Sequence, residues 1–480
     1  MERGRSGARP HFSLQVSAFR VNPFSVAAPQ KPLSRRPPAH EPQPSVAPAP
    51  KPPPPSGPVE IGWLPDCVYT GEKFETNLAF FADSLGRITR FSREPADLAK
   101  ARRLAGQAAL PGLVNGHSLS WQRVLRGRGG AQGWDDLRAK TAARLREEEI
   151  FEAARMAFTE MMLSGITCVG EFHELRRLPD GSPTAEANAT AKAIVRAAHE
   201  AGIRIALFDA PALAGDKPRS RIDAVDSYLR ELEALRADIV TRYPADEAWL
   251  GVAPESFEAL PPDAFKAIAA YSHAQRLRLQ TRAAVALLAS NDLVDKRLTL
   301  LGGSQLTDED CQLLGAARAA VCVCPSHERA EGRRSAPVER LLAAGSAIAI
   351  GTAGNAQIDL LKDARQLDYE LRVGSGKTFA LGAKALFHAA TVAGARSLGA
   401  TGGALEVGRP ADFFTVSLYD PSIAGADPAS LLSSVVFGLE RRAIREVWIG
   451  ARQIISGGRH PNQGVIVGRF VELQRRIWAD

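Results

Sequence analysis

The sequence predicts an α/β fold: a (β/α)8, TIM-like barrel with a small β-sandwich domain built from segments before and after the barrel. Between residues 110 and 400 the apolar period switches repeatedly between strand-like and helix-like, mostly with one unit every 20 to 55 residues. Segments rich in short apolar runs flank this region on both sides. An eightfold series that closes on itself explains this alternation better than an open sheet does.

A proline-rich segment, residues 1–57, opens the chain and holds close to half of its 32 prolines. Such a composition buries too little apolar surface to offset the entropy of ordering, so we expect a disordered or polyproline-like tether. Its many arginines and few acids leave an organellar transit peptide as an alternative. A proline-rich arm that docks on an aromatic-lined groove of a partner is a third possibility.

Two segments are expected to form the sandwich. Residues 58–109 contain short apolar runs broken by turns, such as Asn77 to Ala82 followed by Ser84 to Ile88. Residues 401–480 have the same character in Ala411 to Val416 and Glu446 to Gly450, and they end in a C-terminal tail. Short β-rich runs with turn residues between them are typical of a small sheet domain.

The barrel is assigned to residues 110–400, where eight apolar runs of strand length occur in order. These runs are Leu110 to His117, Thr167 to His173, Arg204 to Ala210, Ala248 to Pro254, Leu277 to Ala283, Leu298 to Gly303, Val321 to Pro325 and Ala347 to Thr352. Helical patterns with apolar spacings of three and four separate most of them, at Ala142 to Met162, Ala185 to Ala201, Ile222 to Tyr243 and Asp308 to Ala319. In such a barrel, function resides at the carboxyl ends of the strands.

Composition narrows the classes of partner. The formal net charge of +7 comes largely from the first segment, and the rest of the chain interleaves both signs. We therefore expect no nucleic-acid surface, because no basic stripe with interleaved aromatic residues appears. Five irregularly spaced cysteines do not make a disulfide framework, and no apolar run reaches the length of a membrane span, so we expect a cytoplasmic protein without a membrane segment.

Few side chains at the predicted strand ends can carry chemistry. Catalytic candidates are Glu171, His173 and Glu255, and His117 and Glu174 are further possible metal ligands. A catalytic metal needs three or four convergent donors, yet no His-x-His pair occurs among the nine histidines. A rebuilt site from His117, His173 and a glutamate stays open, beside the simpler view that both imidazoles are hydrogen-bonded within the barrel mouth.

Several motifs resemble the amidohydrolase superfamily, and most closely the formimidoylglutamate deiminases. The segment Pro111 to His117 is similar to the first barrel strand of that superfamily. Further similar segments follow in the expected order: Gln122 to Gly127, Ser164 to His173, Pro179 to Gly181, Ala253 to Pro254, Asp363 to Tyr369, Gly408 to Asp412 and Val447 to Arg452. The resemblance spans about residues 59 to 465 and implies the barrel-plus-sandwich fold.

The resemblance also implies which positions would hold a metal that activates water for attack on a carbon–nitrogen centre. Only His117 matches such a ligand position. The others are replaced by Leu119, Gln280, Gly302 and Ala353, and Ala283 stands where the general base would be. Gln122 matches a substrate-contact position of the family, whereas an arginine that would clamp a carboxylate is replaced by Glu258.

Two functional hypotheses follow. The first is a catalytically inactive relative, a pseudoenzyme that binds a small molecule or acts as a scaffold in a homo- or hetero-oligomer, with no cofactor. The second is an active hydrolase on a non-peptide carbon–nitrogen bond. It would use one zinc or iron in a rearranged site, or a metal-free pair such as His173 with Glu171 or Glu255.

Overall fold

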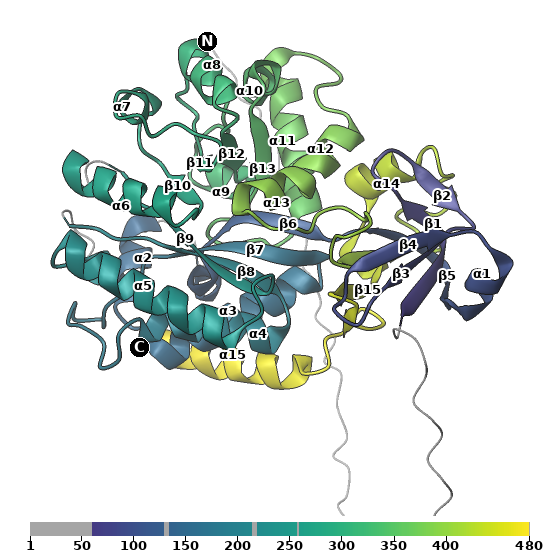
Figure 1. Cartoon of the computed structure of the whole chain (residues 1–480), viewed down its shortest axis with the longest axis horizontal. Coiled ribbons are helices and arrows are strands. Elements are labelled where there is room, and N and C mark those ends of the chain that lie inside the picture. Colours follow the sequence, from purple (N-terminus) through teal and green to yellow (C-terminus); the bar gives the residue numbers. More distant parts are fainter. Residues whose placement is uncertain (1–59, 129–133, 214–217, 257–258, 480) are drawn as a thin grey trace, which may run out of the picture. The chain divides into compact units, whose positions relative to one another are not determined.

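The computed structural model describes residues 60–128, 134–213, 218–256 and 259–479 (Figure 1). The predicted proline-rich tether and Glu258 lie outside these residues. Eight strands form the barrel: β6 (Leu113–Ser118), β7 (Ile166–His173), β8 (Arg204–Asp209), β9 (Ala248–Val252), β10 (Leu279–Thr281), β11 (Leu298–Leu301), β12 (Ala320–Val323) and β13 (Ala347–Ile350). Neighbouring strands pair in parallel in sequence order, and a parallel bridge between Ser118 and Ala353 joins the two ends of the sheet. The predicted barrel is confirmed.

Helices connect consecutive strands and surround the barrel (Figure 1). They are η1 (Ser120–Leu125), α2 (Trp134–Ala142) and α3 (Glu147–Met162) after β6; α4 (Ala189–Ala201) after β7; η2 (Pro218–Ser220) and α5 (Val225–Arg242) after β8; α6 (Pro262–Ala274); α7 (Val285–Ala289); α8 (Asp308–Ala316); α9 (Pro325–Ala330) and α10 (Val338–Ala344); and α11 (Leu360–Ser375), α12 (Ala383–Ala389) and α13 (Val392–Leu398) after β13. The helix expected at 142–162 is α3, which begins five residues later than expected, and the shorter helix α2 precedes it.

A second, mostly antiparallel sheet combines both flanks of the barrel. Its strands are β1 (Ile61–Tyr69), β2 (Phe74–Thr76), β3 (Ala79–Ala82), β4 (Ile88–Ser92), β5 (Arg102–Pro111), β14 (Phe413–Ser417), β15 (Ile444–Ile449) and β16 (Arg452–Ile455). Short helices α1 (Pro95–Lys100), α14 (Leu431–Gly438) and η3 (Arg441–Ala443) accompany it. Trp63, Phe80, Phe413 and Trp448 pack together in its core, with ring centroids 5.1 to 5.8 Å apart.

The first barrel strand begins later than the apolar run suggests. Residues 110 and 111 still belong to β5 of the second sheet, and β6 starts at Leu113. The break falls at Gly112, where a Cβ atom would collide with the side chain of Thr167. One apolar run therefore serves two sheets, because a glycine permits the close approach at which the chain passes between them.

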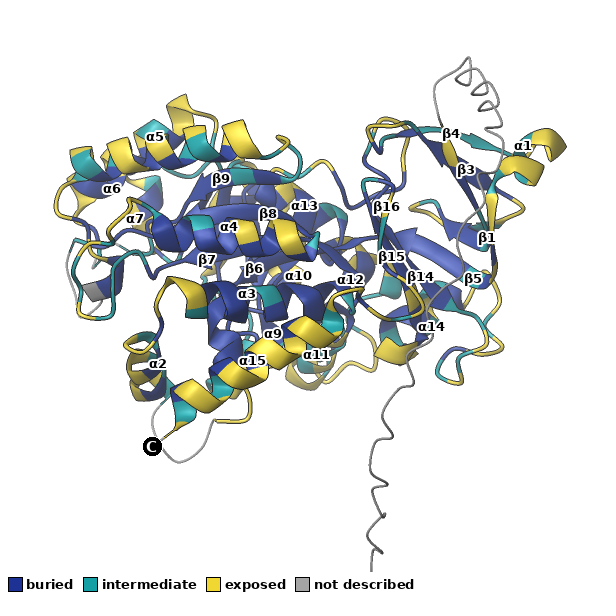
Figure 2. Cartoon of the chain, turned by 90° about the horizontal axis from the view of Figure 1, so that it is seen from below, coloured by how far each residue is buried: buried dark blue, intermediate teal, exposed yellow. Residues whose placement is uncertain are grey.

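The C-terminal residues form helix α15 (Gln463–Trp478), which packs against α3 on the outside of the barrel (Figure 2). Its buried face consists of Ile466, Phe470, Leu473 and Ile477. Gln474 Nε2 and Trp478 Nε1 both donate to the carbonyl of Val124, at 2.8 and 3.3 Å. The helix therefore supports the loop after β6. Within the described part of the chain, none of the helices is long and apolar enough to cross a membrane.

Candidate functional site at the carboxyl ends of the barrel strands

His117, at the end of β6, is buried and hydrogen-bonded on both ring nitrogens. Its Nδ1 lies 3.3 Å from Gln280 Oε1, and its Nε2 lies 3.4 Å from Arg282 Nη2. A guanidinium can only donate, so Nε2 accepts and Nδ1 carries the proton. Burial, followed by the charge of Arg282, lowers the pKa of His117 well below its ordinary value. This imidazole is therefore neutral, and the lone pair on its Nε2 faces the guanidinium of Arg282.

Gln280 lies on the short strand β10, which ends at Thr281, and Arg282 follows directly. The backbone N–H of Arg282 donates to Glu255 O at 2.8 Å. The amide of Gln280 is fixed in both directions, since its Nε2 donates to Gly116 O at 2.9 Å while its oxygen accepts from His117. The side chain of Gln280 therefore orients His117.

The other residues that the sequence resemblance aligns with metal ligands, Leu119, Gly302 and Ala353, have no donor side chain. Leu119 is buried, and Ala353 is buried with a positive φ of 42°, its backbone N–H donating to His117 O at 2.9 Å. Gly302 has a φ of 78°, with no atom within 4 Å of where a Cβ would lie. Among the residues that the structure describes, no group of three or more His, Cys, Asp or Glu side chains could hold a metal ion.

Glu171, near the end of β7, is fully buried in a hydrogen-bonded network. Its Oε1 accepts from the backbone N–H and the hydroxyl of Ser120, at 2.6 and 2.5 Å. Burial raises the pKa of Glu171 to about 8, and the hydroxyls of Ser120 and Ser118 oppose this rise. The carboxyl group is therefore mainly protonated at neutral pH.

The network continues along the mouth through uncharged side chains. Asn115 Nδ2 donates to Thr352 Oγ1 at 2.8 Å, and Thr352 Oγ1 donates to Asn355 Oδ1 at 2.6 Å. Asn355 Nδ2 then donates to Ser118 Oγ at 3.0 Å. These buried bonds join the ends of β6 and β13, where the barrel closes, so their first role is structural.

His173 lies two residues beyond Glu171 on the same strand but makes separate contacts. Its Nε2 is 3.3 Å from Thr190 Oγ1. Burial, with further contributions from Arg176 and Arg219, lowers the pKa of His173 to about 3, so the imidazole is neutral. Arg176 in turn forms a buried ion pair with Asp209 at the end of β8.

Glu255, after β9, lies beside Arg282. Its backbone carbonyl accepts from Thr281 Oγ1 at 3.0 Å as well as from the Arg282 N–H, and its Oε1 lies 3.9 Å from Arg282 Nε. The three catalytic candidates thus have different neighbours: Ser120 contacts Glu171, Thr190 contacts His173, and Arg282 contacts Glu255.

Gln122, on η1, is buried and faces Arg138 of α2. With its amide oxygen turned toward Arg138, it accepts from Nε and Nη2, both at 3.2 Å. A Cβ on Gly354 would lie 2.7 Å from Gln122 and 3.1 Å from His327, so both side chains lie beside the loop that follows β13. Burial lowers the pKa of His327 to about 4, and the charges of Arg282, Arg333 and Arg138 contribute.

Sequence reasoning did not assign Arg282, Arg138 or His327 to the site. Arg282 stands at the end of a predicted strand, and this position alone could have indicated that it belongs to the site. Arg138 lies on α2 and His327 on α9, and neither position is distinguished by a motif. Only the fold brings them together.

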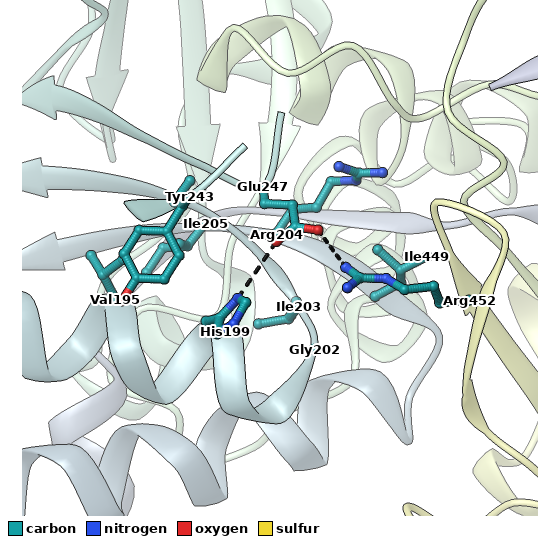
Figure 3. Close-up of a pocket in the computed structure, with 11 residues that line it drawn as sticks. Val195, His199, Gly202, Ile203, Arg204, Ile205, Tyr243, Glu247, Ile449 and Arg452 are labelled. Atoms are coloured by element: carbon teal, nitrogen blue, oxygen red, sulfur yellow. Dashed lines mark hydrogen bonds and ion pairs between the residues drawn. The ribbon is translucent and has the colours of Figure 1, made fainter. Parts of the chain in front are cut away.

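A small cavity lies at the opposite, amino-terminal ends of β8 and β9, beside the turn between β15 and β16 (Figure 3). His199, Glu247 and Arg452 line it, and both basic side chains pair with Glu247, at 3.5 Å for the imidazole and 2.6 Å for the guanidinium. In barrels of this type, the amino-terminal face contributes to stability. The candidate functional site therefore stays at the carboxyl ends.

The barrel is joined to a sheet whose strands come from before and after it in the sequence. Buried polar side chains gather at the carboxyl ends of the barrel strands, which is the face where barrels of this class place their function. The chain belongs to the amidohydrolase family, which matches residues 108–459. It is 28% identical to formimidoylglutamate deiminase of Pseudomonas aeruginosa over 441 residues, covering 84% of this chain and 96% of that protein. It is 24% identical to 5'-deoxyadenosine deaminase of Methanospirillum hungatei, covering 70% of this chain and 75% of that protein.

Solved structures share the fold. An amidohydrolase from Brucella melitensis superposes with a TM-score of 0.79 at 22% identity, covering 87% of this chain and 99% of that one. An adenosine deaminase from Xanthomonas campestris with bound zinc superposes with a TM-score of 0.76 at 20% identity, covering 88% and 99%.

The side chains present at the mouth do not fit such a metal. A histidine ligand must offer its lone pair to the ion, but Nε2 of His117 already accepts a hydrogen bond from a guanidinium. A second cation at the same nitrogen would be repelled by Arg282. We therefore derive no chemical step that passes through a metal.

Proposed function

We propose that this chain is a noncatalytic member of the amidohydrolase family, a pseudoenzyme whose barrel mouth binds a small molecule. The observation that carries this proposal is the contact of Arg282 Nη2 with His117 Nε2 at 3.4 Å. It places a permanent positive charge at the imidazole that the family resemblance assigns to metal binding. Leu119, Gln280, Gly302 and Ala353 at the remaining positions support the same conclusion.

The acid/base candidates add further support. Both His117 and His173 are held neutral, chiefly by burial. Glu171 is fully buried and accepts a hydrogen bond from the Ser120 N–H. A general base must lie within hydrogen-bond reach of the substrate proton that it accepts, and its pKa must be near the working pH. His173, with a pKa of about 3, is a poor base at neutral pH.

The second candidate function is an active hydrolase on a non-peptide carbon–nitrogen bond. The specific observation in its favour is the match to formimidoylglutamate deiminase across 96% of that protein's length. It would require either a zinc or iron in a rearranged site or a metal-free pair of His173 with Glu171 or Glu255.

An activity assay separates the two proposals. Purified chain is incubated with formimidoylglutamate and with 5'-deoxyadenosine, the compounds named by its relatives, with and without added zinc, and ammonia release is followed. We expect no release above that of a protein-free reaction, and the same result for the His173→Ala, Glu255→Ala double variant. Turnover that disappears in the double variant would overturn the noncatalytic proposal.

A further inference from the structure

Arg282 directs a fixed positive charge to the centre of the barrel mouth. One of its nitrogens contacts His117, and its side chain remains 32% exposed, so solvent reaches the guanidinium. Its Nε is buried without a hydrogen-bond partner, because Glu255 Oε1, at 3.9 Å, lies beyond bonding distance. A buried N–H without a partner is unfavourable, and a bound acceptor would remove that cost.

A second guanidinium, that of Arg138, stands nearby on α2. Gln122 fixes its orientation through two hydrogen bonds, and Glu174 Oε1 lies 3.5 Å from its Nη2. His327 lies beside Gly354, as Gln122 does, and the charges of both Arg282 and Arg138 lower its pKa. Both guanidiniums are therefore near this imidazole at the mouth.

We infer that Arg282 takes the place of the family's metal as the cationic anchor of the ligand, and that the ligand is a small organic acid whose carboxylate binds to Arg282 and Arg138. This inference rests on the proposed function. A guanidinium presents several N–H groups in a planar fork that matches the two oxygens of a carboxylate. None of the family's metal-ligand positions is needed for this contact.

The chemistry of the guanidinium sets the ligand class. A metal ion binds a neutral carbonyl or water through a single lone pair, whereas a guanidinium binds best to a group with two oxygens and a negative charge. A neutral amide of the same size would satisfy fewer donors and add no negative charge beside Arg282. The site should therefore discriminate strongly between an acid and its amide.

Calorimetric titration with succinate and glutarate, and with the matching neutral diamides, tests this inference on the full chain. We expect the diacids to bind at least tenfold more tightly than the diamides. Arg282→Gln should weaken diacid binding at least tenfold, and Arg282→Lys, which keeps the charge but loses the fork, should fall between. Arg475→Gln, on the exposed face of α15, is the matched control and should bind like the unaltered chain.

Equal binding of diacids and diamides, or diacid binding that survives in folded Arg282→Gln, would overturn the inference. If Arg282→Gln fails to fold, Arg138→Gln serves in its place, with the same expected loss. Absence of both stoichiometric metal and diacid binding overturns the inference alone and leaves the noncatalytic proposal standing. Stoichiometric metal at His117 would overturn both.

Discussion

Glu171 shows how burial sets the behaviour of a single residue in this barrel. Its carboxyl group is fully buried and has a pKa of about 8, against 4.5 in the ordinary case. A raised carboxyl pKa means that the folded state favours the protonated form. The contribution of Glu171 to folding therefore becomes less favourable as pH rises from about 4.5 to about 8, and it is constant outside that window.

Glu171→Gln should remove this pH dependence. The glutamine oxygen can still accept from Ser120, and the group remains neutral at every pH. We expect the variant to match the unaltered chain in stability near pH 5 and to exceed it near pH 8, by on the order of a few kcal/mol. Urea unfolding followed by circular dichroism at the two pH values measures the difference. A gap that is equal at both would contradict the assigned pKa.

Thr352 tests whether the neutral network closes the barrel. Its hydroxyl accepts from Asn115 and donates to Asn355, so Thr352→Val removes one hydrogen bond from each of these buried amides. We expect a loss of about 1–3 kcal/mol in the free energy of unfolding. Thr401→Val, at an exposed position, is the control and should change the value by less than about 0.5 kcal/mol. Equal effects of the two substitutions would argue against the network.

At the scale of the element, the barrel strands could be predicted because buried parallel strands are short apolar runs separated by helical patterns. Each of the eight predicted strand regions overlaps a barrel strand. Helix α15 escaped prediction for a physical reason: Gly464, Gly468 and three exposed valines lower its helix propensity, so that only packing on α3 stabilises it.

Phe470→Ala should therefore destabilise α15 and the loop that it supports. Phe470 is 1% exposed, and its removal leaves a cavity, so we expect a loss of about 3–5 kcal/mol. Val471→Ala, one residue further and 39% exposed, should cost less than about 0.5 kcal/mol. Thermal unfolding of both variants makes the comparison. A marginal effect of Phe470→Ala would mean that α15 contributes little to the fold.

The site was less predictable than the strands. Residue order placed Glu171 and His173 at one strand end, but it could not show that their hydrogen bonds go to Ser120 and Thr190. Arg282 was visible at the end of a strand, yet an arginine has several rotatable bonds and commonly points to solvent. Its contact with His117 requires the ends of β6 and β10, which are not neighbouring strands, to face each other across the barrel mouth. Only the closed fold brings them there.

At the scale of the whole molecule, one buried ion pair joins the barrel to the second sheet. Arg204 at the start of β8 bonds to both carboxylate oxygens of Asp412, at 2.7 and 3.0 Å, and Asp412 also accepts from the Gly450 N–H at 2.7 Å. Asp412 precedes β14, and Gly450 lies between β15 and β16. The pair therefore connects segments far apart in the sequence.

Asp412→Ala should leave Arg204 buried with only Asp246, at 3.3 Å, as a partner. We expect a loss of about 3–5 kcal/mol, because an uncompensated buried charge is costly. The double variant Arg204→Met, Asp412→Leu should recover much of that loss. Urea unfolding of the single and double variants tests this, and a single variant as stable as the unaltered chain would contradict the role of the pair.

We propose that the contact between Arg282 and His117 has replaced the family's metal chemistry. Elemental analysis by mass spectrometry of the untagged chain, purified without chelator and again after exposure to zinc, tests it most directly. We expect metal well below one ion per chain in well-folded protein. About one zinc or iron per chain, lost on His117→Ala substitution, would contradict it.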